Sequence, residues 1–339
     1  MTATATLPAA ALAPPLPRFA QIEPIGKCNL ACRMCTVNDR GDEVAELSLQ
    51  RFEQLLDQMP GLQELHLQGL GEPMLHPQFF DMVAMAAGRG IKVSANTNLT
   101  LLTPRRALAC ISSGLASLSV SLDGATAPVY EAIRRKANFA KVLRNLQRLV
   151  DARDEAGSAL EVRLVMVLMR ANLHELPALV QLAHAHRVDW ILVQRLSSDL
   201  TQPDLPQRYI PIKQYVEQAE LGPADLAEAE DVFAQARTLA AQLGVRLNLP
   251  RLQPATERGR RCDWPSTQLY LTAAGELLPC CMVATADRAS FGKVFAPGSD
   301  APLLLERWHG ASAQQFRAAL ASDQPPAVCQ SCALYQGTF

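Results

Sequence analysis

The feature of this sequence that most restricts its fold is a regular alternation of short β-rich runs with longer helical patterns between Phe19 and Leu196. Strands and helices that alternate in this way predict right-handed βαβ units around a parallel sheet. We therefore expect an α/β fold, with the sheet either doubly wound or curved into a full or partial barrel. The expected strands are Ala20–Pro24, Glu64–Gln68, Ile91–Asn96, Ser117–Leu122, Glu161–Leu168 and Trp190–Gln194.

Two of the intervening helices carry recognisable start signals. Ser48 and Thr103 are candidate N-caps, because a short hydroxyl side chain can accept a hydrogen bond from an amide of the first turn. Pro104 fits the first helical position, where no amide hydrogen is needed. The helices expected in this region are Ser48–Gln58, Pro77–Gly88, Thr103–Ser112 and Leu173–Arg187.

A change of pattern after Leu196 predicts a second, smaller unit. Prolines interrupt the stretch that follows, and 339 residues exceed the length at which a single core usually stops growing. A helix at Leu226–Leu243, a strand at Val245–Leu249 and a hairpin at Gln268–Leu278, turning at Ala274–Gly275, are expected next. The expected organisation is a flexible leader at 1–18, a core domain at 19–196, a linker and helical excursion at 197–250 and a small α+β cysteine-rich domain at 251–339.

Composition narrows the classes of partner. Apolar residues make up 49% of the chain, and a formal net charge of -1 without a long basic run gives no footprint for nucleic-acid binding. The apolar N-terminal stretch lacks a basic start and contains prolines, so it does not read as a signal peptide, and no later run is long enough for a membrane span. We expect a cytoplasmic protein without a nucleic-acid or membrane partner. In a reducing compartment its nine cysteines favour metal or redox chemistry over disulfides.

Three of these cysteines, Cys28, Cys32 and Cys35, form a closely spaced group directly after the first expected strand. Ligand-binding groups gather at the carboxyl ends of parallel strands, where this loop should lie. A [4Fe–4S] cube has four irons, so three thiolates leave one iron open to a small molecule. The alternative is a structural zinc site or a set of buried thiols, but structural zinc prefers four protein ligands and no fourth lies nearby in the sequence.

The CxxxCxxC pattern of Cys28, Cys32 and Cys35, in a loop after the first expected strand, resembles that of the radical S-adenosylmethionine (SAM) superfamily. The segment Gly69–Pro73 is similar to the loop that binds the methionyl amino group of SAM in that family, although Leu70 interrupts the usual pair of glycines. Asn96 and Ser121 resemble strand-end residues that lie near SAM, with capping and turn formation as the alternative, and core packing is the alternative for Met34. The resemblance implies SAM on the open iron of a [4Fe–4S] cluster and a partial (β/α)6 TIM-like barrel. The cofactor-binding residues that it implies are Met34, Gly69, Gly71, Glu72, Pro73, Asn96 and Ser121.

A second cysteine group lies towards the end of the sequence. Cys262, Cys280, Cys329 and Cys332 resemble the auxiliary-cluster extension of radical SAM enzymes that is called the SPASM or twitch domain. Because no cysteine follows in the sequence, the count implies the shorter twitch form, with one auxiliary [4Fe–4S] cluster on these four ligands. Cys281 is an alternative to Cys280, and a zinc ribbon is the alternative to a cluster.

The resemblance implies reductive cleavage of SAM and hydrogen abstraction from an unactivated carbon. Because a fully ligated auxiliary cluster can relay electrons, we expect a dehydrogenase-type, two-electron oxidation of a small-molecule alcohol or amine such as an amino sugar. The alternatives are a maturase of a ribosomal precursor peptide, a redox-neutral epimerase and an iron–sulfur or zinc-stabilised binding module without catalysis. Expected partners are a small-molecule or peptide substrate and an electron donor such as flavodoxin or ferredoxin. Glu23, His66, Arg163 and Arg195 are candidate bases by strand position alone, so the sequence assigns no catalytic residue.

Overall fold

One curved sheet of ten strands organises the protein in the computed structural model, which describes residues 13–38, 45–196, 200–253, 262–296 and 301–337. In chain order the strands are β1 (Phe19–Ile22), β2 (Glu64–Leu67), β3 (Lys92–Thr97), β4 (Leu115–Ser121), β5 (Glu161–Leu168), β6 (Trp190–Arg195), β7 (Arg246–Asn248), β8 (Gln268–Leu271), β9 (Glu276–Leu278) and β10 (Gly292–Lys293). Strands β1 to β7 are parallel and each pairs with the next. On the other side of β1 the sheet continues with β8, parallel to β1, and then with the antiparallel β9 and β10.

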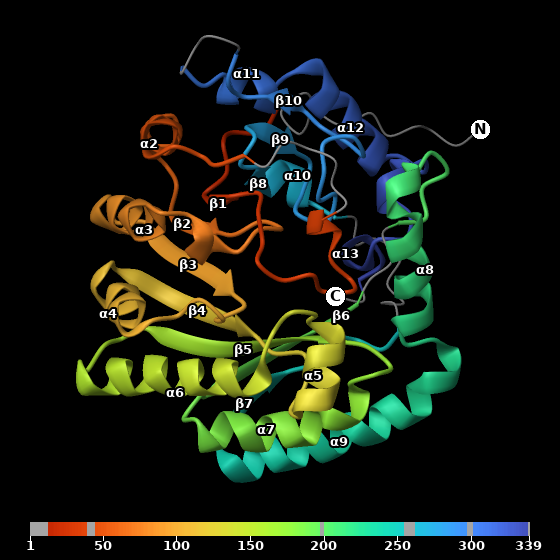
Figure 1. Ribbon diagram of the computed structural model, residues 1–339. Coiled ribbons are helices and arrows are strands. Elements are labelled where there is room, and N and C mark those ends of the chain that lie inside the picture. Colours follow the sequence, from red (N-terminus) through yellow and green to blue (C-terminus); the bar gives the residue numbers. More distant parts are fainter. Residues whose placement is uncertain (1–12, 39–44, 197–199, 254–261, 297–300, 338–339) are drawn as a thin grey trace.

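Helices lie outside the curved parallel sheet, and the C-terminal elements lie beside β1 (Figure 1). The α-helices are α2 (Leu49–Asp57), α3 (Phe79–Gly88), α4 (Pro104–Ser112), α5 (Ala127–Ile133), α6 (Phe139–Glu155), α7 (Leu176–Ala185), α8 (Ile210–Ala219), α9 (Leu226–Leu243), α10 (Trp264–Thr267), α11 (Leu304–Trp308), α12 (Ala311–Ala321) and α13 (Ala333–Gln336). Among the described residues, no helix has the length and apolar character needed to cross a bilayer. The expected α/β class, a partial barrel with a small C-terminal cysteine-rich unit, is confirmed.

The expected helix starts are confirmed in detail. The Oγ atom of Ser48 accepts a hydrogen bond from the amide of Arg51 at 3.2 Å, and Oγ1 of Thr103 accepts one from the amide of Arg106 at 3.3 Å. Pro104 occupies the first turn of α4. Each cap satisfies an amide that has no partner inside its helix, which fixes where α2 and α4 begin.

The six core strands, the four expected core helices, α9, β7 and the β8–β9 hairpin lie within a few residues of their predicted positions. The helices without a counterpart in the prediction are α5, α6, α8 and α10 to α13. Helix α8 has Pro211 in its first turn, a position where proline is tolerated, so that proline did not mark a break. The buried face of α6 includes Val142, Leu146 and Leu149, which have the spacing of an amphipathic helix, so its signal was present in the sequence. The domain boundaries after residues 196 and 250 stay predictions.

A continuous apolar core joins the barrel to the C-terminal unit. Ile22 of β1, Leu271 of β8 and Leu277 of β9 are fully buried in the same cluster, together with Trp308 of α11. The Trp308 indole donates a hydrogen bond to the carbonyl of Pro14 at 2.8 Å. The C-terminal unit is therefore packed against the first strand rather than joined to it only through a linker.

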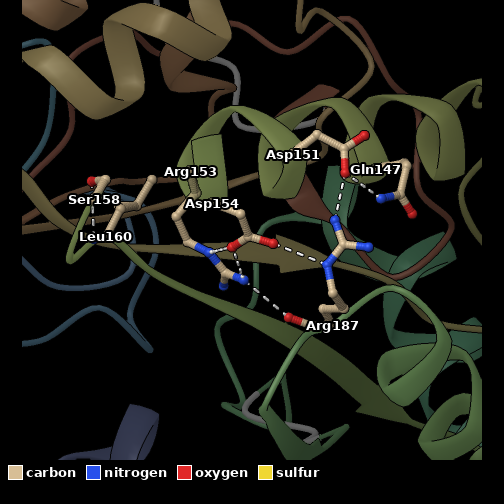
Figure 2. A network of polar contacts seen from close by, with 7 residues as sticks. All are labelled: Gln147, Asp151, Arg153, Asp154, Ser158, Leu160 and Arg187. Atoms are coloured by element: carbon tan, nitrogen blue, oxygen red, sulfur yellow. Dashed lines mark hydrogen bonds and ion pairs between the residues drawn. The ribbon is translucent and has the colours of Figure 1, made fainter. Parts of the chain in front are cut away.

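A surface network ties α6 to the turn that precedes β6 (Figure 2). Arg187 donates to Asp151 at 2.5 Å and to Asp154 at 2.9 Å, while Arg153 pairs with Asp154 at 2.7 Å. Gln147 donates to the same Asp151 carboxylate at 2.7 Å. Because these ion pairs are largely exposed, each contributes little by itself to the free energy of unfolding.

Candidate functional site

The loop that follows β1 carries the first cysteine group, Cys28, Cys32 and Cys35. All three are free thiols, and they lie close enough to one another to interact electrostatically. Burial raises the pKa of each thiol, that of Cys35 to about 12. Thiols in such a place need a positively charged partner to exist as thiolates near neutral pH, and iron is a partner of that kind.

Backbone hydrogen bonds fix this loop against the end of α5. The amides of Ala31 and Arg33 donate to the carbonyls of Arg135 and Ile133, at 3.1 Å in each case. On its other side the carbonyl of Lys27 accepts a hydrogen bond from the amide of Glu72 at 2.9 Å. Glu72 belongs to the segment Gly69–Pro73, which we call the glycine loop. The fold itself therefore sets the position of the three cysteines.

A cavity of about 220 Å³, which we call the cysteine cavity, opens beside the first cysteine group. Its lining comes from the ends of β2 to β6 and from the loops that follow them, as the rule for parallel sheets requires. Six of the seven predicted cofactor-binding residues line it together with the three cysteines: Met34, Gly69, Gly71, Glu72, Asn96 and Ser121. Pro73 is not part of the lining; it is buried at the start of a short 3₁₀ helix.

The two glycines of the segment Gly69–Pro73 are required by packing within the protein. A Cβ atom at Gly69 would lie 2.4 Å from Cγ of Glu23, and one at Gly71 would lie 1.9 Å from the Ile25 carbonyl oxygen. The resemblance to the SAM-binding loop relates these two glycines to a ligand. In the structure the approach of the cysteine loop already excludes any larger residue.

Glu23 joins three parts of the site through one buried carboxylate. Its Oε1 accepts hydrogen bonds from the amides of Leu70 at 2.8 Å and Gly71 at 3.3 Å. Its Oε2 accepts one from the amide of Ala273, in the turn between β8 and β9, at 3.1 Å. Because the side chain is fully buried and holds backbone amides, Glu23 acts as a structural clamp rather than as the base considered from the sequence.

The side chain of Glu72 fixes the end of β3 through hydrogen bonds. Oε1 accepts from the Thr97 hydroxyl at 2.7 Å and from the Met74 amide at 3.1 Å, and Oε2 accepts from the Asn98 amide at 2.7 Å. Burial raises the pKa of this carboxyl, while the same hydrogen bonds oppose that rise. The amide of Glu72 is the one that donates to Lys27, so this residue ties β3 to the cysteine loop.

Two further polar residues reach the cysteines and were missed in the sequence. Nδ2 of Asn98 lies 3.8 Å from Sγ of Cys28, and Nη1 of Arg134 lies 4.0 Å from Sγ of Cys32. Burial works to lower the pKa of Arg134, but the neighbouring Asp123 carboxylate, whose Oδ2 lies 2.7 Å from Nε, outweighs it and keeps the guanidinium charged. Asn98 directly follows β3, whereas Arg134 directly follows α5, a helix that was not predicted from the sequence.

A second hollow of about 300 Å³, the barrel chamber, lies inside the strands. Asn96, Val165 and Gln194 line both this chamber and the cysteine cavity, so the two adjoin. Of the bases considered from the sequence, His66 and Arg163 line the barrel chamber. Arg195 does not; its guanidinium donates to the carbonyls of Leu252 at 2.8 Å and Leu221 at 2.6 Å and borders a separate hollow of about 470 Å³.

The second cysteine group, Cys262, Cys280, Cys329 and Cys332, is also brought together. Cys332 interacts electrostatically with both Cys262 and Cys280, and Cys280 does so with Cys329. Burial is the main cause that raises the pKa of Cys280 well above its ordinary value. Cys281 adjoins Cys280 and is less buried, so the choice of Cys280 as ligand stays a prediction. The surrounding apolar side chains are Trp264, Tyr270, Leu278, Val283 and Val328.

The donor sets at both cysteine groups fit iron–sulfur clusters. Within the described residues, no three His, Cys, Asp or Glu side chains converge as the ligands of one metal ion would. A [4Fe–4S] cluster does not require such convergence, because each thiolate binds a different iron. At the first group an open cavity adjoins three thiols, as a cluster with one unligated iron needs. At the second group four thiols share an apolar surrounding.

Comparison with known proteins assigns both parts of the chain. The family model of the radical SAM superfamily matches residues 22–183, and the SPASM model, an iron–sulfur cluster-binding domain, matches residues 262–333. These ranges contain the first and the second cysteine group, respectively.

Individual relatives agree with these matches. The mycofactocin maturase MftC of Mycobacterium tuberculosis (strain CDC 1551 / Oshkosh) is 32% identical over 157 residues, which cover 46% of this chain and 39% of the relative. The PqqA peptide cyclase of Rhodopseudomonas palustris is 26% identical over 337 residues, which cover 96% of this chain and 81% of the relative. The solved structure of Streptococcus suis SuiB bound to the precursor peptide SuiA aligns with a TM-score of 0.69 at 18% identity, over 95% of this chain and 71% of that one.

The extent of these matches limits what they transfer. The chain spans about two fifths of the length of MftC, and at 18% identity the likeness to SuiB shows the fold alone. The two family models, the ordered cysteine motifs and the parallel barrel nevertheless agree. The chain belongs to the radical SAM superfamily and carries a C-terminal SPASM iron–sulfur cluster-binding region.

Proposed function

We propose that the chain is a radical SAM enzyme in which Cys28, Cys32 and Cys35 hold a [4Fe–4S] cluster and the cysteine cavity holds SAM. The proposal is carried by one observation: the three cysteines and six predicted cofactor-binding residues line a single cavity. When bound, the cluster and SAM together supply a 5′-deoxyadenosyl radical that removes a hydrogen atom from an unactivated carbon.

The part of the protein in this reaction is to position and to shield. Asn98 and Arg134 can donate to the sulfurs of Cys28 and Cys32, which favours the thiolate form of both. Glu72 holds the end of β3, and therefore Asn98, in place. Because these groups are already fixed by buried hydrogen bonds, little reorganisation is needed when SAM enters.

We further propose that Cys262, Cys280, Cys329 and Cys332 hold an auxiliary [4Fe–4S] cluster. Four protein ligands leave no iron open to grip substrate, and such a cluster suits electron transfer. The net reaction is then a two-electron oxidation, with flavodoxin or ferredoxin as the electron donor. A cytoplasmic location belongs to the same proposal, because a reducing compartment keeps all nine cysteines available.

Two substrate classes fit this reaction. A small-molecule alcohol or amine, such as an amino sugar, is the first candidate, and the barrel chamber of about 300 Å³ has the volume of a small-molecule site. A peptide is the second candidate, favoured by the names of the relatives, which include a maturase, a peptide cyclase and SuiB bound to its precursor peptide.

The experiment that tests this function begins with anaerobic reconstitution and the counting of iron and sulfide. We expect about eight irons per chain in the wild type and about four in the Cys28→Ala/Cys32→Ala/Cys35→Ala variant or in the Cys329→Ala/Cys332→Ala variant. Zinc in place of iron would contradict the proposal.

Cell extract is then separated into a peptide fraction and a small-molecule fraction, and each fraction is tested for whether it stimulates the formation of 5′-deoxyadenosine. A product lighter by the mass of two hydrogens indicates oxidation, whereas an unchanged mass indicates the redox-neutral alternative.

A further inference from the structure

The barrel chamber lies nearer the amino ends of the strands than the cysteine cavity does. Its lining includes Glu64 and Lys92, at the starts of β2 and β3, whereas the cysteine cavity lies at the strand ends. Asn96, Val165 and Gln194 border both. A molecule held in the chamber would therefore adjoin whatever occupies the cysteine cavity.

Small polar residues line this chamber where a closed barrel would carry bulky ones. Ser94 of β3 and Ser117 and Ser119 of β4 belong to the lining, and the last two are buried. Branched apolar residues such as Val, Ile and Leu dominate the interior of a filled (β/α) barrel. Serines at these positions leave space and supply hydroxyl groups, as in a binding site for a polar molecule.

Positive charge predominates in the lining. Among the described residues that border the chamber, Arg163 and Lys92 are the cations and Glu64 is the carboxylate. The Arg163 guanidinium lies 4.3 Å above the Trp190 ring, and its Nη2 lies 3.3 Å from Oε2 of Glu161, which does not border the chamber. A guanidinium has five N–H donors in a planar fork, so this single contact leaves donors for a second acceptor.

His66 adds polarity to the chamber without adding charge. Its Nδ1 lies 2.8 Å from the Ser94 hydroxyl and its Nε2 lies 2.6 Å from Oε1 of Gln68. Burial, together with the charge of Arg163, lowers the pKa of this imidazole to about 4, against a favourable contribution from the Gln68 contact. Because Oε1 of the Gln68 amide accepts, the proton of the neutral imidazole lies on Nε2.

We infer that the barrel chamber is the substrate site and that it binds a carboxylate group through the Arg163 guanidinium. The inference rests on the proposed function, because it places the substrate beside SAM. A planar guanidinium matches a carboxylate in a two-point contact, and the serine hydroxyls can bond the polar groups next to it. A free hydroxy acid and an acidic residue of a peptide share this chemistry, so the test has an arm for each.

The test measures binding to the reconstituted protein, saturated with SAM and kept without reductant. Calorimetric titration compares gluconate with neutral gluconamide, and a terminally blocked tripeptide with a central glutamate with its glutamine counterpart. In at least one pair we expect the carboxylate to bind about tenfold more tightly, the range of a charge-assisted hydrogen bond. The pair that shows the preference identifies the source of the carboxylate.

Three variants assign the preference to its residue. Arg163→Gln should reduce it below about twofold, whereas Arg163→Lys should retain part of it because the charge remains. Arg246→Gln is the matched control: Arg246 lies 4.9 Å from the Trp190 ring and 3.2 Å from Glu161, but it does not border the chamber. This variant should keep the full preference.

Three results would overturn the inference: equal affinities within both pairs, no binding of either carboxylate at millimolar concentration, or the same loss in Arg246→Gln as in Arg163→Gln. Because no reductant is present, the outcome is independent of SAM cleavage. A protein that prefers the carboxylate but forms no 5′-deoxyadenosine would refute the proposed function. A protein that forms 5′-deoxyadenosine but shows no preference for the carboxylate would refute this inference alone.

Discussion

The substitution Gly71→Ala tests how the glycine loop and the cysteine loop are held together. The added Cβ would lie 1.9 Å from the Ile25 carbonyl oxygen and 2.9 Å from that of Lys27, and both are backbone atoms that cannot rotate aside. The Lys27 carbonyl also accepts the amide of Glu72 at 2.9 Å, so a shift large enough to relieve the contact strains that hydrogen bond. Overpacking costs about 1–3 kcal/mol and a buried unsatisfied amide a similar amount, which together predict a loss of about 3 kcal/mol.

Differential scanning calorimetry of the reconstituted protein at one fixed scan rate measures this loss. At about 2 °C per kcal/mol for a chain of this size, Gly71→Ala should lower Tm by about 6 °C. Gly61→Ala is the matched control, because nothing lies within 4 Å of its added Cβ, and its Tm should change by less than about 1 °C. A Gly71→Ala protein that melts with the wild type would refute the close packing of the two loops.

Three other substitutions probe buried and exposed charge. Glu23→Gln keeps an oxygen that accepts from the amides of Leu70 and Gly71 but turns an N–H group towards the amide of Ala273. We therefore expect thermal unfolding to show a loss of about 1–3 kcal/mol in the free energy of unfolding. The exposed Glu53→Gln is the control and should leave this free energy unchanged. The pKa of His66 is about 4 in the folded protein and about 6.5 in the unfolded chain. Between these two pH values only the unfolded chain binds the proton, so the free energy of unfolding falls as pH falls. From pH 7 to pH 5 this amounts to about 2 kcal/mol, which His66→Gln should remove; parallel pH curves of the two proteins would contradict the burial of His66. Arg187→Gln should lower Tm at low salt but not in about 1 M salt, because its partners Asp151 and Asp154 are exposed (Figure 2). The hydrogen bond from Arg153, and to a smaller extent that from Arg187, lowers the pKa of Asp154 below its ordinary value. The contribution of Asp154 to the free energy of unfolding is therefore present above about pH 4 and is lost as pH falls further, which a pH series of melting curves would show.

Local patterns allowed much of this structure to be predicted. The caps at Ser48 and Thr103 act within one helical turn, and the spacing of Cys28, Cys32 and Cys35 is a property of one loop. Residues that depend on contacts between distant segments gave no comparable signal. Glu23 binds an amide 250 positions away, and Arg134 reaches Cys32 across 102 positions, so neither role follows from sequence spacing.

The same distinction applies to the glycines and to the barrel chamber. Gly69 and Gly71 line the cysteine cavity, but the contacts that require a glycine at each position, with Glu23 and Ile25, are seen only in the folded chain. The serines of β3 and β4 resemble ordinary strand-end polar residues in the sequence. Only the curvature of the sheet brings Ser94, Ser119 and other inward-facing side chains around one hollow.

The most direct test of the central claim is the formation of 5′-deoxyadenosine under anaerobic conditions from SAM and dithionite. The reconstituted wild type should form it, and so should Cys110→Ala, which removes a buried cysteine of α4 that belongs to neither group. The Cys28→Ala/Cys32→Ala/Cys35→Ala variant should form none above the protein-free background. Undiminished formation by this triple variant would show that SAM is cleaved elsewhere and would contradict the assignment of the site.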